Sequence, residues 1–237
     1  MLLTTSGLVL HTTPYGEASV VAKVFTRQLG VRSYIVKGVR GPRGRVKQNL
    51  LQPLSSLDMV VYNNHHNDIN HVRELTPRHP DLTPDAVANA LRFFMTEVLY
   101  KALREEEPMP DLWDYVEQTT DELKATSGSS SRDVPLLFLL TVARHLGIAP
   151  LDNYSAREPY FDLQEGHYVG APAETTLSPA LSAMLHDYLS SCQSVNLSSY
   201  QLPERRALLD ALIAYYQLHL SGFNNFHSHD ILHTILR

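Results

Sequence analysis

Five basic side chains are gathered in residues 37–47, a stretch that reads KGVRGPRGRVK and contains no acid. They are Lys37, Arg40, Arg43, Arg45 and Lys47. The glycines and the proline between them disfavour a regular helix, so the sequence predicts a flexible, cationic loop. Such a loop suits a polyanion, because each neutralised phosphate releases a condensed counterion without requiring one fixed geometry. Nucleic acid is the first candidate ligand, and a solvated hairpin tip that binds nothing is the alternative.

Three more side chains near predicted turns extend this candidate site. Tyr15 lies in the turn-like string PYGE, where an exposed ring beside arginines could stack on a base. The same ring could instead pack on the surface of its own domain. Arg27 and Arg32 flank a predicted turn at residues 28–31, where each is either a phosphate ligand or a solvated charge.

Charge is divided unevenly along the chain, although the net charge of the 237 residues is only −5. Residues 1–80 hold ten Lys or Arg and four acids, a net charge of +6, whereas residues 81–237 have a net charge of −11. This division favours a nucleic-acid-binding module joined to an acidic body. The single cysteine, Cys192, excludes an internal disulfide and agrees with a reducing compartment. With no long apolar segment or signal-like start, we expect a cytoplasmic, nucleoid-associated protein that does not enter a membrane.

The first part of the chain has the pattern of short strands. The runs LVLHT, VVAKVFT, VRSYIVK, LDMVVY and INHVREL are rich in Val, Ile and Tyr and are separated by turn-forming residues. Five strands of this length predict a small, partly open barrel of the OB-fold type, which commonly binds single strands.

From Thr83 the apolar spacing becomes helical, and Thr83-Pro84-Asp85 has the composition of a helix start. Further helices are predicted at residues 111–123, 134–146, 179–191 and 203–220, and the one at 134–146 is nearly all apolar. The predicted fold class is therefore α+β. An OB-fold barrel at residues 1–79 is followed by an all-helical domain at residues 80–237, which carries a small hairpin at about 150–170.

Several strings resemble the RecO family of bacterial recombination mediators. They are GLVLHTTPYGEAS from Gly7, VFTRQLG from Val24, KGVR from Lys37 and LQPL from Leu51. The resemblance implies a DNA-repair protein that binds single- and double-stranded DNA and anneals complementary strands. It further implies that the partner RecR helps this protein load the RecA recombinase onto strands coated with single-stranded-DNA-binding protein (SSB).

The segment GIAPLDNYSAREPYFDLQEGHYVG, from Gly147, also resembles this family, in which many members carry a four-cysteine zinc element there. Tyr154 and Arg157 align with the first cysteine pair, and Gly170 lies near the third position. The zinc ligands are absent, so we expect no metal and no other cofactor. The hairpin would have to be held by its aromatic residues instead.

The resemblance also implies a groove for the acidic, apolar C-terminal tail of SSB. Such a groove needs a basic rim and an apolar floor, even within an acidic domain. Arg132 and Arg144 flank the most apolar helix, although Arg144 could simply extend from that helix to solvent. Arg205 and Arg206, at the start of a later helix, are the alternative rim.

Twelve histidines raise the possibility of a metal site. His229 and His233 have i, i+4 spacing after His227, and His65, His66 and His71 surround a polar turn. No carboxylate stands in the register of a hydrolytic motif, and no nucleotide-binding loop is present. We therefore expect no catalytic residues and no enzyme. An RNA-binding or scaffolding OB-fold protein, which recruits another protein through its helical domain, is the alternative function.

Overall fold

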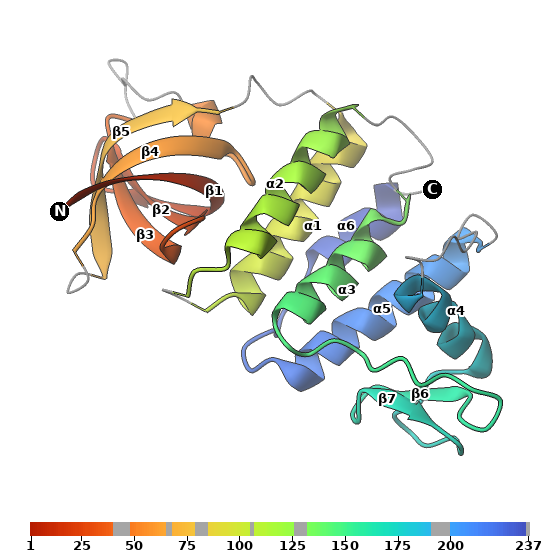
Figure 1. Ribbon diagram of the computed structural model, residues 1–237. Helices are drawn as coiled ribbons and strands as arrows, with labels where there is room; N and C mark the ends of the chain where they lie inside the picture. Colours follow the sequence, from red (N-terminus) through yellow and green to blue (C-terminus); the bar gives the residue numbers. More distant parts are fainter. Residues whose placement is uncertain are drawn as a thin grey trace. The chain divides into compact units, whose positions relative to one another are not determined.

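The computed structural model describes residues 1–39, 48–64, 68–78, 85–104, 107–125, 132–190 and 200–235 (Figure 1). The chain forms two compact units, Met1–Thr126 and Ser127–Arg237. Within the described residues, no helix is both long and apolar enough to cross a membrane.

The first unit contains a closed five-stranded barrel. Its strands are β1 (Leu2–Tyr15), β2 (Ser19–Thr26), β3 (Gly30–Lys37), β4 (Ser56–Tyr62) and β5 (Ile69–Pro77), with a short 3-10 helix, η1 (Gln48–Leu51), before β4. The order around the barrel is β1-β2-β3-β5-β4, and β4 closes onto β1. Only the β3–β5 pair is parallel. This barrel and the helices after it confirm the predicted α+β architecture.

Alternate side chains along each strand point inward and fill the barrel. Val20, Ala22 and Val24 of β2 point inward, as do Tyr34 and Val36 of β3, and all five are buried in one core. The intervening residues of these strands therefore face outward.

β1 is longer than predicted, since it begins at Leu2 and includes Pro14 and Tyr15. The turn that we placed at PYGE is shifted to residues 16–18, where Gly16 has a positive φ of 59°. Pro14 is tolerated in the strand because β1 pairs with β4 only through Leu2–Leu8, so beyond Leu8 it has the single neighbour β2.

Two helices, α1 (Ala86–Ala102) and α2 (Pro110–Ala125), pack with the barrel in the first unit (Figure 1). Asp85 caps α1 by accepting hydrogen bonds from the backbone N–H groups of Val87 and Ala88. The indole N–H of Trp113 in α2 donates to the carbonyl of Phe25 in β2 at 3.0 Å. The predicted boundary at residues 79 and 80 follows the change from strands to helices, whereas the compact units follow packing and group α1 and α2 with the barrel.

Gly30 is needed where the connection between α1 and α2 meets the barrel. It has a φ of +69°, and a Cβ atom there would lie 2.4 Å from the carbonyl oxygen of Glu107. No side chain fits at that distance, so glycine allows this close approach of two backbones.

The second unit is helical, with α3 (Val134–His145), α4 (Pro179–Leu189), α5 (Leu202–His219) and α6 (Ser228–Ile235). The buried residues of α3 include Leu136, Phe138, Leu139 and Val142, and α3 packs against both α4 and α5. This nearly all-apolar helix thus belongs to the core of the second unit.

A hairpin of β6 (Tyr160–Asp162) and β7 (His167–Val169) lies between α3 and α4, close to its predicted place. Tyr168 is fully buried, and both Phe161 and Tyr154 pack edge-on against its ring at centroid distances of 5.0 and 5.3 Å. The side-chain amide of Asn153 donates to the carbonyl of Tyr168 and accepts from its N–H. Aromatic packing and one amide thus hold the hairpin.

We predict that Tyr168→Ala destabilises the protein by about 3 kcal/mol or more, because it opens a cavity beneath two rings. Tyr168→Phe should cost only about 1 kcal/mol, since it removes only the hydroxyl that donates to the Ser182 carbonyl. Urea unfolding followed by circular dichroism would measure both. The half-buried Tyr160, on the same hairpin, is the matched control, and an equal loss for Tyr160→Ala would contradict this account.

Candidate nucleic-acid interface

Tyr15 and Lys37 lie at the same end of the barrel. In the strand register Tyr15 is opposite Ser19, and Ser19 is opposite Lys37, so one row crosses three strands. Both side chains are exposed, Tyr15 at 53%. The N–H of Val39 donates to the carbonyl of Ala18 at 3.0 Å, which fixes the exit of β3 to the β1–β2 turn. Arg40, Arg43, Arg45 and Lys47 lie outside the described residues, but the segment that leads into them starts beside Tyr15.

Two further rows continue from this end across the outward side of β1, β2 and β3. We call the nine residues of the three rows the open face: Tyr15, Ser19, Lys37, Thr13, Val21, Ile35, His11, Lys23 and Ser33. All are exposed or half-buried, and none is acidic. At the other end of these strands, the outer surface is covered: Phe25 and Leu8 are fully buried where α2 docks. The open face is the part of the sheet on which an OB-fold commonly holds a strand.

Arg27 is at the opposite end of β2 and is paired. Its Nε and Nη2 donate to the two carboxylate oxygens of Asp114 in α2 at 2.7 and 2.8 Å. The hydrogen bond from Arg27 lowers the pKa of Asp114, and the same bond raises the pKa of Arg27. Arg27 is therefore far along β2 from Tyr15 and Lys37, and it binds a carboxylate of α2.

Arg32 is not on the barrel rim, where we expected it. It lies on the inward side of β3 with Tyr34 and is only 6% exposed. Burial raises the pKa of Tyr34 to about 12, and the positive charge of Arg32 opposes that rise. Arg32 is the third residue of β3 (Gly30–Lys37), and alternation along this strand turns its side chain inward.

A basic pocket lies in the second unit between α3, α5 and α6. Its lining residues are Arg132, Pro135, Leu136, Leu202, Arg205, Arg206, Leu209, Leu232 and His233. Leu136, Leu209 and Leu232 are buried and form an apolar floor, whereas Arg132 is exposed at the rim. The structure thus brings Arg132 together with Arg205 and Arg206, which the sequence offered as alternatives.

The two α5 arginines of this basic pocket are held in place differently. Arg205 is 8% exposed, and its Nε donates to Asp133 at 2.8 Å. Asp133 also accepts from the hydroxyl of Tyr188, whose pKa is raised by burial and by this contact. Arg206 is half-buried and donates to the carbonyl of His233 in α6. Arg205 thus contacts a carboxylate, and Arg206 contacts a backbone carbonyl.

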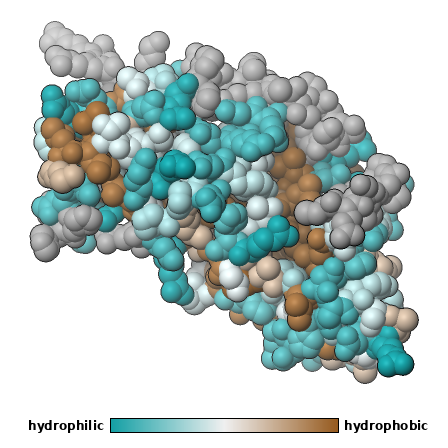
Figure 2. Space-filling model, in the orientation of Figure 1, coloured by the Kyte–Doolittle hydropathy of each residue, from teal (hydrophilic) through white to brown (hydrophobic). Residues whose placement is uncertain are grey.

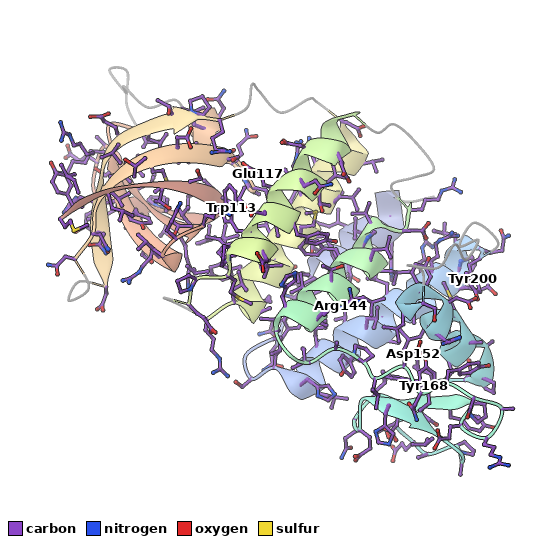
Figure 3. The ribbon with its side chains drawn as sticks, viewed as in Figure 1. Trp113, Glu117, Arg144, Asp152, Tyr168 and Tyr200 are labelled. Atoms are coloured by element: carbon purple, nitrogen blue, oxygen red, sulfur yellow. The ribbon has the colours of Figure 1, made fainter. Side chains whose placement is uncertain are left out.

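Arg144 lies apart from the basic pocket. It is exposed in the last turn of α3, whereas Arg132 precedes the first turn, and Figure 3 shows Arg144 near the end of that helix. The 12 residues of α3 separate the two by roughly 18 Å. At this position Arg144 can complement the helix dipole and reach solvent.

His229 and His233 lie next to each other in α6 (Ser228–Ile235). The rings of His229 and His233 meet edge-on at 5.8 Å, and the nearest carboxylates, Asp230 and Asp210, each lie 3.4 Å from one ring. Across the described residues, no group of three or more His, Cys, Asp or Glu could hold a metal ion. His71 is exposed on β5, and His65 and His66 lie outside the described residues.

Asp152, His186 and Ser190 form a cluster that resembles a hydrolase triad in composition only. The Nδ1 atom of His186 lies 2.7 Å from Asp152, and Ser190 donates to the other oxygen of Asp152 at 3.1 Å. The hydroxyl oxygen of Ser190 lies 3.5 Å from the same nitrogen, Nδ1 of His186. A general base would have to face serine with its other nitrogen, so this arrangement cannot relay a proton from Ser190.

Several acidic side chains gather on one surface of α2. Asp114, Glu117, Gln118, Asp121 and Glu122 line a shallow surface there, and the visible face over α2 is largely hydrophilic (Figure 2). Two of these acids bind basic residues of the barrel, since Glu117 accepts from Arg78 at 2.9 Å and Asp114 from Arg27. Figure 3 shows Glu117 and Trp113 projecting from α2 toward the barrel.

Comparison with known proteins agrees with this architecture. The family model for the recombination protein O N terminal matches residues 1–80, and the model for its C terminal matches residues 83–228. The chain belongs to the RecO family. It is 30% identical to the DNA repair protein RecO of Porphyromonas gingivalis strain W83, with 99% of each chain covered. It is 27% identical to the DNA repair protein RecO of Christiangramia forsetii, again over 99% of each.

The zinc that the family resemblance implied does not fit the residues of this RecO chain. Tyr154, at an aligned ligand position, stacks on His186 at 4.7 Å and packs against Tyr168. Arg157 offers no electron pair at neutral pH, and Gly170 has no side chain. Hydrogen bonds take the place of ligands: Asp162 accepts from the N–H groups of Gln164 and Glu165 and from the Thr175 hydroxyl.

These bonds predict how the hairpin responds to acid. Burial would raise the pKa of Asp162, but the hydrogen bonds from Glu165, Gln164 and Thr175 outweigh it and lower the pKa. A carboxyl with a depressed folded-state pKa stabilises the fold above its unfolded value of about 3.9 and loses that contribution as pH falls through the folded value. Asp162→Asn should therefore cost roughly 1–3 kcal/mol at pH 7 and progressively less below about pH 4.

Urea unfolding of both proteins between about pH 3 and pH 7 would measure this difference. A difference that stays constant over the range would show that the charge of Asp162 is not involved. A chelator should leave both unfolding curves unchanged, and a chelator-induced loss of stability would contradict the metal-free account.

Proposed function

We propose that this RecO-family protein is a DNA repair and recombination mediator that binds single- and double-stranded DNA and anneals complementary strands. The observation that carries the proposal is the open face, where Tyr15 and Lys37 stand in one row beside the exit to the cationic loop. Its lysines and the loop would neutralise the phosphates of two strands, which lowers their repulsion and lets bases pair. Tyr15 supplies a ring for stacking.

The mediator needs no catalytic step. Strand pairing releases free energy once the phosphates are neutralised, so neither a nucleophile nor a bound nucleotide is required. With RecR the protein would help load RecA onto SSB-coated single strands in the cytoplasm, where it would be associated with the nucleoid. A strand-annealing assay on SSB-coated oligonucleotides tests this. Annealing should proceed without ATP, and a dependence on ATP hydrolysis would refute the proposal.

The basic pocket is proposed to take the C-terminal tail of SSB. Its apolar floor suits the apolar end of the tail, and its rim of Arg132, Arg205 and Arg206 suits acidic side chains and a terminal carboxylate. The pocket is a local cationic site within a domain of negative net charge. This explains how an acidic peptide could bind there despite long-range repulsion.

We predict that Lys37→Ala weakens binding of all single-stranded sequences alike and lowers the log–log salt slope by about 0.7. The triple change of Arg40, Arg43 and Arg45 to Ala should lower the slope further, by about 0.7 for each lost contact. Arg27→Ala is the matched control, because Arg27 is already paired with Asp114. Fluorescence anisotropy at several salt concentrations measures the slope. Equal effects of Lys37→Ala and Arg27→Ala would contradict the assigned interface, and tighter binding to RNA of the same sequence would favour the RNA-binding alternative.

We further predict that Arg132→Ala and Arg206→Ala each weaken binding of a labelled SSB-tail peptide at least fivefold, whereas Arg144→Ala changes it less than twofold. The loss of one charge-assisted hydrogen bond to the tail has about this effect. Arg205 is a poor choice for the test, because its removal would leave Asp133 without its cation. If Arg144→Ala has the largest effect, the tail binds elsewhere.

A further inference from the structure

Helix α1 exposes only one narrow stripe. Of its residues Ala86–Ala102, three are exposed, namely Ala86, Phe93 and Tyr100, spaced by seven positions. Phe93 is 52% exposed and Tyr100 is 40% exposed, whereas Phe94, Val98 and Leu99 beside them are fully buried. The helix therefore turns its apolar sides inward and still presents two large aromatic rings, two turns or roughly 10 Å apart.

Tyr100 adjoins the open face. Its ring lies 5.3 Å from the ring of His11 on β1, and the ammonium group of Lys23 on β2 lies 5.0 Å from the ring centroid. His11 and Lys23 are opposite each other in the strand register and form the last row of the open face. Tyr100 thus adds a ring to that row, and the nearby cation increases the attraction of this place for a phosphate.

The surroundings of the two rings favour a stacked base over an apolar partner. On α1 the neighbours of Phe93 one turn away include Asn89 and Glu97, and Glu97 is also one turn from Tyr100. Glu97 is compensated by Lys101 at 3.9 Å, and Arg104 is exposed. Single rings among polar and charged side chains can act as stacking platforms for single strands, whereas a protein partner would need a continuous apolar patch.

We propose that a single strand leaves the open face over Lys23, stacks a base on Tyr100, and continues along α1 to stack a second base on Phe93. The inference rests on the proposed DNA binding and extends it to a second element. The open face would bind the first nucleotides, and α1 would lengthen the site. The strand is identified by its chemistry, phosphates for Lys23 and π-faces for the rings.

The test compares two oligothymidylates of about five and about fifteen nucleotides, the ends of the usual range for an OB-fold site. Tyr100→Ala and Phe93→Ala should each weaken binding of the longer one roughly fivefold or more, and that of the shorter one less than twofold. Tyr100→Phe should bind as the unchanged protein does, because it keeps the ring. Leu218→Ala, which removes an exposed apolar side chain from α5, is the control and should have no effect.

Two further measurements separate stacking from a structural role. The salt slope should stay the same in Tyr100→Ala, since no phosphate contact is lost, and the thermal midpoint should be unchanged. A 5-iodouracil placed within the longer strand should crosslink to Tyr100. The inference is overturned if the unchanged protein binds the longer strand and both alanine variants bind it equally well. If the unchanged protein binds neither strand, the proposed function itself fails.

Discussion

The docking of α2 on the barrel determines which surface remains for a ligand. The indole of Trp113 reaches the backbone of β2, and Arg78 lies over that indole at 5.8 Å while it binds Glu117 and Asp58. This contact covers the outer side of β1 and β2 around Phe25. The same two strands stay uncovered toward Tyr15, so the open face exists because the helices stop where they do.

This docking also divides the cations of the barrel into two groups. Arg27 and Arg78 bind acids of α2 or β4, and Arg32 is inside the barrel, so these three serve the fold. Lys23 and Lys37 lie on the outward rows of a face that has no acid. A count of charges along the sequence cannot separate these groups. The net positive charge of residues 1–80 is therefore larger than the charge that a ligand meets on the open face. For binding, the position of these cations matters more than their number.

Local patterns were enough to predict the barrel and the helices, because alternation, caps and turn residues act within a few positions of the chain. The site depends on strand register and on helix packing, and these bring together residues that are far apart in the sequence. The adjacency of Tyr15 and Lys37 follows from a ladder through Ser19, and Arg132 meets Arg206 only because α3, α5 and α6 pack together. Lys23 and Tyr100 were missed for the same reason. Outward alternation on β2 could have indicated Lys23, whereas no local signal pairs it with a helix 77 residues later.

The hairpin is held without the zinc element that the family resemblance implied. Zinc ligands fix a small element through a few strong bonds, but the cysteine thiolates of such a site are absent from residues 147–170. Tyr154, Phe161 and Tyr168 supply buried ring contacts instead, and Asn153 and Asp162 satisfy backbone groups that would otherwise be left unpaired. Several weak contacts must then form together, so the element depends on its packing against Ser182 of α4 and on Tyr215 of α5. The hairpin is in this sense part of the core of the helical unit, and it cannot be removed without exposing that core.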